Sequence, residues 1–292
     1  KVSISFLKGT LDIRFNFGPD FRYYRNGTFR NEESISSEGK NRASLSNQSD
    51  FSWTLDNLIY YNKEFGKHSV GLTLLQSATG YHYEESSMAA EGIPLEKCEM
   101  ECVIKRKCLL LDEWNSGLIE KQLLSYMFRV NYDYNNKYLL TVSGRWDGAS
   151  QLAEGNKWAF FPSAALGWRL DQKEFLKDVT WLNQLKFRLG VGVTGNSAID
   201  PYQTKGAIVS LYYPFGSALA PGYAASEPLI KDGAVAMANK NLSWEKTTQY
   251  NIGLDYSVLN GRISGVLDFY TSRTTDLLMA MTIPSLNGYT NT

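Results

Sequence analysis

The chain has 292 residues with a formal net charge of zero, 43% hydrophobic residues and 13% aromatic residues. It has no run of about 18 or more apolar residues, which excludes a membrane-spanning α-helix, and no basic stripe with interleaved aromatics that would suggest a nucleic-acid partner. The hydrophobic content suits a soluble protein and equally a β-barrel, whose polar lumen and loops dilute the apolar signal.

The chain opens with Lys1-Val2-Ser3, without the initiator methionine, basic segment or apolar core of a signal peptide. A strand pattern begins at once, so we expect an internal piece of a longer polypeptide. Period-two alternation of apolar and polar residues predicts strands. The predicted strands, in chain order, are 2–7, 10–17, 51–61, 68–78, 120–134, 138–146, 158–170, 183–194, 247–258 and 262–273.

The clearest predicted hairpin runs from Leu124 to Trp146 around the turn 135–137. Its first arm has apolar or aromatic residues at every even position from 124 to 134, and its odd positions are polar apart from Met127. Each arm has roughly ten residues, about twice the mean soluble strand and the length that a tilted strand needs to cross a bilayer. The hairpin therefore indicates an outer-membrane barrel.

Connections between the predicted strands alternate between short and long. The short ones are 8–9, 62–67, 135–137, 171–182 and 259–261, and the long ones are 18–50, 79–119, 147–157 and 195–246. Strict alternation puts all short turns at one end of the sheet and all long loops at the other. Transmembrane barrels have tight periplasmic turns and large extracellular loops. We therefore predict an all-β fold, a transmembrane antiparallel barrel of which this chain supplies about ten strands.

Several blocks together resemble one family, and their combined order is highly specific. These blocks are YLLTVSGRWDGASQLAEGNKWAFFPSAALGWRL (138–170), EFLKD (174–178), LKFRLGVGVTGNSAIDPYQ (185–203), NLSWEKTTQYNIGLDYSVLNGRISGVLDFYTSRTTDLL (241–278), IPSLNGYTNT (283–292) and, more weakly, FLKGTLDIRFNFGPDF (6–21). About two-thirds of the chain is similar to the SusC/RagA family, the TonB-dependent outer-membrane transporters of Bacteroidota.

The resemblance implies a 22-stranded barrel around an N-terminal plug, with a SusD-like surface lipoprotein as a lid. It implies uptake of oligosaccharides or peptides driven through the TonB complex, in the outer membrane and in contact with its lipid. Residues 1–292 would form a segment of the barrel domain alone, because nothing matches the plug or the C-terminal strands. The resemblance implies no enzyme and no cofactor. A sheet with two open edges is not tolerated in a bilayer, so the segment cannot be the functional unit by itself.

The long loop 195–246 is the best candidate for binding. Among its Gly, Pro and Ala residues it holds Tyr202, Tyr212, Tyr213, Phe215 and Tyr223. Aromatic rings bind the apolar faces of sugars and anchor protein interfaces. Packing of the loop, contact with the lid lipoprotein and contact with substrate all stay open. On the polar strand faces, Arg129, Arg145, Lys186 and Arg188 are expected to meet plug carboxylates or an anionic substrate.

Motifs that would indicate chemistry are weak here. All three cysteines, Cys98, Cys102 and Cys108, lie in 97–113, where zinc-type CxxC pairs and histidines are absent, so we expect an unusual insertion or an erroneous stretch of sequence rather than a metal site. The glycines of GVGVTG (190–195) are expected inside a strand with no helix after it, unlike a dinucleotide site. The acidic pairs 32–33 and 84–85 are expected to be solvated loop charges.

Two other functions stay open. The first is a siderophore- or cobalamin-type TonB-dependent receptor that works without a lid lipoprotein. The second is a soluble all-β carbohydrate-binding module, in which the apolar strand faces would point inward.

Overall fold

The structure is a computed structural model that describes residues 1–33, 39–91, 110–173, 176, 179, 181–204, 209–215, 218–224 and 239–279. At position 8 and in 110–113, 209–215 and 218–224 it describes the backbone alone. No helix within these ranges is long and apolar enough to cross a membrane.

Nearly all regular structure in the described chain is β-strand. The first five strands are β1 (Val2–Phe6), β2 (Leu11–Arg30), β3 (Arg42–Phe65), β4 (His68–Glu91) and β5 (Leu110–Tyr134). The next three are β6 (Tyr138–Ala149), β7 (Trp158–Arg169) and β8 (Leu182–Asn196). The last four are β9 (Val209–Phe215), β10 (Ala218–Ala224), β11 (Glu245–Val258) and β12 (Ile263–Thr275). Two short 3-10 helices, η1 (Leu7–Gly9) and η2 (Leu170–Gln172), lie in turns.

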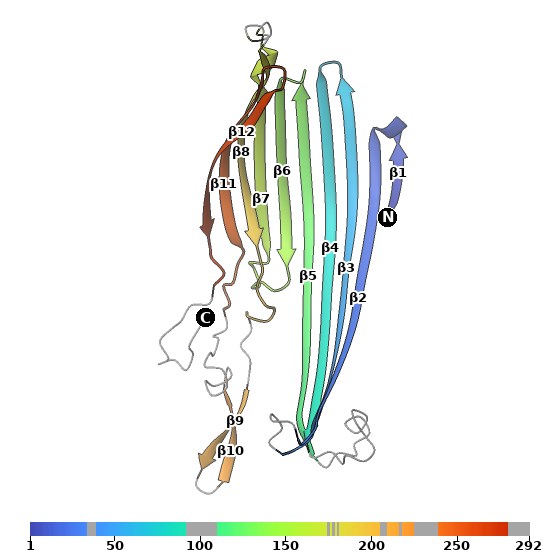
Figure 1. The fold of residues 1–292 in the computed structure, drawn as a ribbon, viewed down its shortest axis with the longest axis vertical. Coiled ribbons are helices and arrows are strands. Elements are labelled where there is room, and N and C mark those ends of the chain that lie inside the picture. The colour runs from blue at the N-terminus through green and yellow to red at the C-terminus, as the bar shows by residue number, and fades with distance from the viewer. Residues whose placement is uncertain are drawn as a thin grey trace. The chain divides into compact units, whose positions relative to one another are not determined.

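Ten strands form one sheet in the order β1-β2-β3-β4-β5-β6-β7-β8-β11-β12, and β9 with β10 forms a separate hairpin (Figure 1). Consecutive strands are neighbours except that β8 pairs with β11, so the hairpin β9–β10 is an excursion within one long connection. All ten predicted strands are present, and the prediction of an all-β, partial antiparallel barrel is confirmed. The GVGVTG glycines lie inside β8, as predicted.

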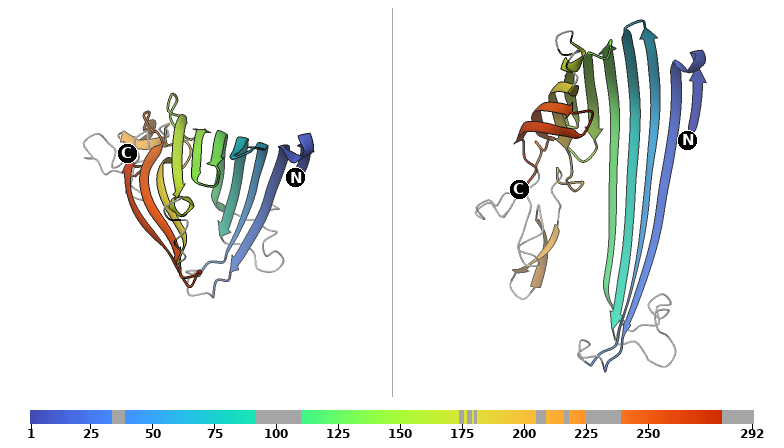
Figure 2. Two further views of the ribbon diagram at one scale, coloured as in Figure 1. Left: turned by 90° about the horizontal axis from the view of Figure 1, so that it is seen from above. Right: turned by 45° about the horizontal axis from the view of Figure 1, so that its top comes forward.

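The chain divides into two compact units. The first comprises Lys1–Asn16, Asp56–Ala78 and Leu123–Thr292, and the second comprises Phe17–Leu55 and Thr79–Gln122. Strands β2 to β5, drawn from blue to green in Figures 1 and 2, contribute residues to both units. Strands β6 to β8, β11 and β12 belong to the first unit alone.

The sheet of the first unit has one apolar and one polar face, because paired residues on neighbouring strands share a face. One apolar row runs from Tyr132 on β5 to Phe269 on β12, and its members are Tyr132, Leu140, Leu166, Leu189, Ile252 and Phe269. Leu140 is 40% exposed and Phe269 is 73% exposed. A soluble module would bury such a face, whereas a barrel turns it to lipid.

Aromatic side chains lie at both ends of this apolar face. Near the short turns, Tyr138 stacks between Tyr134 and Trp168, with ring centroids 6.4 and 6.3 Å away. Near the long loops, Trp158 stacks on Tyr126 at 6.3 Å. Tyr126 and Tyr134 are eight residues apart on β5, about 26 Å along the strand, which a tilt of about 40° reduces to roughly 20 Å. This spacing is close to the apolar band of about 25 Å in such barrels.

Strands β2 to β5 are much longer than predicted. They contain 20, 24, 24 and 25 residues, so most of the predicted loops 18–50 and 79–119 is strand. A barrel strand needs only about 9–11 residues to cross the bilayer. In Gly80–Glu91, for example, polar residues occur on both faces of the strand, so the apolar alternation that marked the other strands is absent there and the strand was not predicted.

Cross-strand polar contacts hold the second unit together in place of an apolar face. Tyr81 Oη donates to Asp50 Oδ1 at 2.8 Å, and the hydroxyls of Thr28 and Ser44 lie 2.6 Å apart. The ring of Trp53 covers Gly80, where a Cβ atom would lie 2.4 Å from Trp53 Nε1. Cross-strand hydrogen bonds and an aromatic ring over a glycine are recognised sources of sheet stability.

Candidate functional site

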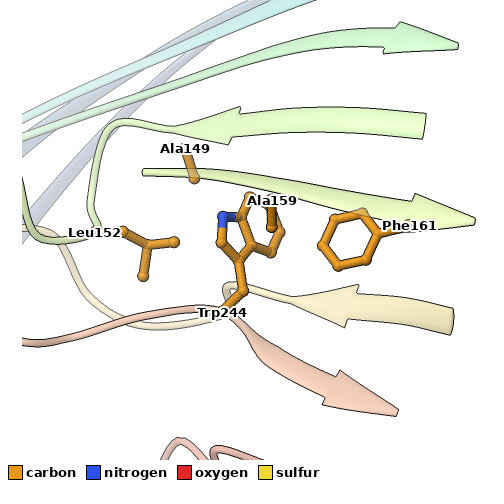
Figure 3. Packing of buried hydrophobic residues seen from close by; sticks show 5 residues of the cluster. All are labelled: Ala149, Leu152, Ala159, Phe161 and Trp244. Atoms are coloured by element: carbon orange, nitrogen blue, oxygen red, sulfur yellow. The ribbon is translucent and has the colours of Figure 1, made fainter. Parts of the chain in front are cut away.

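The long connection between β8 and β11 begins and ends on a small buried core. The core consists of Ala149, Leu152, Ala159, Phe161 and Trp244, which we call the loop-base cluster. Figure 3 shows the indole of Trp244 between Leu152 and Phe161. Trp244 is 5% exposed, and its ring lies 5.3 Å from that of Phe161, with the two planes at 70°.

Hydrogen bonds extend the loop-base cluster to both sides of the long connection. Trp244 Nε1 donates to the carbonyl of Lys157 at 2.8 Å, and the backbone N–H of Ala153 donates to Leu242 O at 3.1 Å. Gln151 Nε2 donates to Ser197 O at 2.8 Å. The β6–β7 loop thus holds the residues that leave β8 and the residues that enter β11, so the loop base is preorganised.

Gly195 allows Phe161 to reach the cluster. A Cβ atom at Gly195 would lie 2.1 Å from the Phe161 ring, which is far inside van der Waals contact. Phe161 is 7% exposed. The register places Phe161 on the face opposite Tyr126 and Trp158, so it is not one of the aromatic residues at the ends of the apolar face.

Of the five predicted loop aromatics, the structure describes the side chain of Tyr202 alone. Tyr202 is 50% exposed, with φ at 71°, a left-handed conformation uncommon for a residue other than glycine. The next residue, Gln203, accepts a backbone hydrogen bond from Asn239 at 3.2 Å, which ties this turn to the returning chain.

The other four predicted aromatics occur in the β9–β10 hairpin. The backbone register pairs Tyr212 with Pro221 and Tyr213 with Ala220, and it pairs Phe215 with Ala218 and Tyr223 with Ser210. The side chains of Tyr212, Tyr213, Phe215 and Tyr223 lie outside the described part of the structure. Their contact with a substrate or a lid stays a prediction.

The polar face of the first unit carries an ion-pair network around Arg188. Its Nε donates to Asp255 Oδ1 at 2.9 Å, and its terminal nitrogen lies 3.1 Å from Asp268 Oδ1. Gly253 leaves the space for this arrangement, since a Cβ atom there would lie 2.6 Å from Asp268 Oδ1. The sequence suggested that Arg188 meets plug carboxylates or an anionic ligand, but the structure gives it two carboxylate partners within the sheet.

A second ion-pair network lies beside the loop-base cluster. Arg145 Nε donates to Asp147 Oδ1 at 2.7 Å, and another Arg145 nitrogen donates to Ser125 Oγ at 3.1 Å. Asp147 and Ser125 are buried, with exposures of 7% and 1%. These contacts link β5 and β6 beside the loop-base cluster.

At the short-turn end, Asp171 fixes the junction between β7 and β8. Burial alone would raise the pKa of its carboxyl group. Hydrogen bonds from Arg169, Gln172 and the backbone N–H of Leu185 outweigh burial, and the pKa is lowered overall. The carboxylate therefore stays ionised and holds the turn.

The cysteine segment and the acidic pair 84–85, considered in the sequence as possible chemical motifs, differ in how far the structure describes them. Residues 97–109, which include all three cysteines, lie outside the described residues, and Leu110 starts β5. Glu84 and Glu85 lie in β4, not in a loop as predicted. Glu84 Oε1 forms a hydrogen bond with His82 Nε2 at 3.1 Å, and Glu85 accepts a hydrogen bond from the Tyr83 hydroxyl group at 2.8 Å. Among the described residues, no group of three or more His, Cys, Asp or Glu side chains could hold a metal ion.

A meandering antiparallel sheet with an exposed apolar face, aromatic residues at both ends of that face and ion pairs on the other face defines a segment of a transmembrane β-barrel. The chain belongs to the family described as TonB dependent receptor-like, beta-barrel, whose model matches residues 3–292. The predicted SusC/RagA membership is confirmed by the relatives below, and proteins of this family are outer-membrane transporters.

Two relatives illustrate the range of similarity. SusC of Bacteroides thetaiotaomicron, a TonB-dependent receptor, is 43% identical over 183 residues, which is 60% of this chain and 17% of SusC. TonB-dependent receptor P26 of Formosa agariphila is 31% identical over 285 residues, which is 95% of this chain and 27% of P26. The chain therefore spans about a quarter of P26, the relative that it matches over almost its full length.

Solved structures show the same fold. The structure of the RagAB peptide transporter aligns with 99% of this chain at a TM-score of 0.85 and 22% sequence identity, and the alignment covers 31% of that structure's chain. RagAB in the state described as open-open gives a TM-score of 0.82 at 24% identity.

Proposed function

We propose that the chain is an internal barrel segment of an outer-membrane, TonB-dependent importer of oligosaccharides or peptides that works with a SusD-like surface lipoprotein. The two-faced sheet carries this proposal. Its exposed apolar face suits outer-membrane lipid, and its ion-paired opposite face suits a lumen closed around a plug.

The relatives support the transport role. SusC is 43% identical over its aligned region, and RagAB, which shares the fold, is a peptide transporter. The segment would carry out no bond chemistry, and Arg188 and Arg145 on its polar face pair with carboxylates of the same sheet. Energy from the TonB complex would act through parts of the protein beyond this segment.

Within this function, Tyr202, Tyr212, Tyr213, Phe215 and Tyr223 would contact the cargo or the lid. The loop-base cluster supports this role by holding both ends of the connection that carries them. A rigid base makes binding by a long loop less costly in conformational entropy.

The test is to extract the full-length parent protein from native outer membranes in mild detergent and to identify what copurifies. We expect a stoichiometric surface lipoprotein, with an oligosaccharide or peptide trapped between it and the barrel. A barrel that purifies alone, under conditions that preserve other lipoprotein complexes, would overturn the lidded importer. That result would favour the lidless siderophore- or cobalamin-type receptor.

A further inference from the structure

A groove crosses four strands of the second unit. It has a volume of about 540 Å³, within the range of roughly 300–1,000 Å³ typical of small-ligand sites. Its lining residues are Tyr23 on β2, Asn47, Gln48 and Ser49 on β3, Glu84, Glu85 and Ser86 on β4, and Ser116, Gly117 and Leu118 on β5. We call it the β2–β5 groove. It is separate from the loop aromatics to which cargo contact was assigned above.

An aromatic ring and an aliphatic side chain supply the apolar surface of the groove. Tyr23 is 61% exposed, and Leu118 is 51% exposed. The hydroxyl group of Tyr23 donates to Asn47 Oδ1 at 3.3 Å, which fixes the ring at its polar end and leaves its face open. An open tyrosine face suits the C–H face of a sugar ring, because the ring's π electrons carry a partial negative charge.

The acidic residues of the groove already have partners. Glu84 Oε1 lies 3.1 Å from His82 Nε2, and His82 Nδ1 lies 3.0 Å from Glu120 Oε1. Glu85 accepts a hydrogen bond from Tyr83 at 2.8 Å. One oxygen of each carboxylate is thus engaged, and the other can accept a hydrogen bond from a ligand hydroxyl group.

Four further polar side chains of the groove are neutral. Within the described part of the chain, no hydrogen bond engages the side chains of Gln48, Ser49, Ser86 or Ser116. Hydroxyl and amide groups both donate and accept hydrogen bonds, as a ligand rich in hydroxyl groups requires. Neutral groups with both capacities, placed beside an open aromatic ring, match a polyol better than a charged peptide.

We propose that the β2–β5 groove binds a short segment of a neutral oligosaccharide, with one sugar ring against Tyr23 and its hydroxyl groups bonded to the serine and amide side chains. This site goes beyond the proposed function, since it would be present whether the imported cargo is an oligosaccharide or a peptide.

The test uses the full-length parent protein in detergent and isothermal titration with neutral hexasaccharides of glucose, mannose, xylose and galactose. The main variants are Tyr23→Ala, which removes the ring, and Ser116→Phe, which fills the groove from an exposed position. Tyr24→Ala is the matched control, because the adjacent Tyr24 is 58% exposed and does not line the groove. Heat-modifiable migration on a gel checks that each variant forms its barrel.

We expect at least one hexasaccharide to bind the unaltered protein. Tyr23→Ala should weaken that binding roughly tenfold, Ser116→Phe should abolish it, and Tyr24→Ala should leave it unchanged. Binding that survives both groove variants would belong to another site and would overturn the proposal. Absence of binding by all four sugars, or binding of a lysine-containing hexapeptide in their place, would also overturn it. Copurification of the lipoprotein, measured on the same variants, separates this result from the test of the importer.

Discussion

Replacing Trp244 by Ala should release the base of the long connection without unfolding the sheet. A buried tryptophan removes roughly 150–250 Å² from water, and Trp→Ala substitutions in a core cost about 3–5 kcal/mol. Trp244 is 5% exposed and also donates to Lys157 O, so we expect a local cost near the upper end of that range. The strands are held by their own ladders, so the effect should stay within the loop base.

Hydrogen–deuterium exchange of the full-length protein in detergent measures this local opening. The amide of Ala153, which donates to Leu242 O, should exchange at least about a hundredfold faster in Trp244→Ala. Trp244→Phe keeps a smaller aromatic ring in the cluster and loses a hydrogen bond worth about 1 kcal/mol, so exchange at Ala153 should rise much less, by about fivefold.

A second tryptophan provides the control. Trp181 is 58% exposed in a turn, and Trp181→Ala should leave exchange at Ala153 unchanged. Unchanged protection in Trp244→Ala would refute the reasoning that the cluster holds the loop. Equal changes in the Ala and Phe variants of Trp244 would show that the hydrogen bond, and not ring burial, is responsible.

Two further predictions concern a glycine and a histidine. Gly195→Ala should destabilise the protein and loosen the loop base, because its Cβ atom would lie 2.1 Å from Phe161. Gly190→Ala should be tolerated, since the nearest atom to its Cβ atom is 3.9 Å away. Denaturant unfolding of the two variants in lipid measures the difference. The pKa of His82 is raised above its usual 6.5 by its hydrogen bonds to Glu120 and Glu84. The charged contact between β4 and β5 should therefore be complete below pH 6.5 and be lost as the pH rises through the raised pKa. The midpoint of an NMR titration of His82 measures this pKa.

For each of these two predictions, one result would contradict the reasoning. Equal stability of the two glycine variants would mean that Phe161 can move away from β8 at little cost. A titration midpoint of His82 at or below 6.5 would mean that its two carboxylate contacts do not persist in solution.

The sequence predicted the fold well where one strand face is apolar. From Leu124 to Ala149, and in β7, β8, β11 and β12, the predicted strand bounds are within a few residues of the structure, because a lipid-facing strand needs an uninterrupted apolar alternation. Strands β9 and β10 were not predicted, since they lie in the predicted loop 195–246. The loop-base cluster was not predicted. Trp244 follows a polar stretch, and its partners Leu152 and Phe161 are distant in sequence, so no local pattern marks it.

The strands of the second unit could not be predicted for a different reason. Their stability comes from backbone pairing and specific polar contacts, such as Tyr81 with Asp50, which leave no periodic trace in the sequence. Tyr23 and Glu84 were therefore placed in loops. The β2–β5 groove was not predicted for the same reason, because it forms only where these four strands lie side by side.

Strand β5 is long enough to have two parts with different surroundings, one that faces lipid and one that lines the β2–β5 groove. From Leu124 to Tyr134 all even positions are apolar or aromatic, as expected of a strand that faces lipid on one side. From Trp114 to Gln122 the strand mixes Asn, Ser, Gly, Glu and Lys with isolated apolar residues, which is unsuitable for hydrocarbon on either face. Strand pairing continues through both parts, but the polar part of β5 does not need the apolar alternation that lipid requires. Small and polar residues such as Ser116 can therefore line a groove while β5 keeps its hydrogen-bonded ladder.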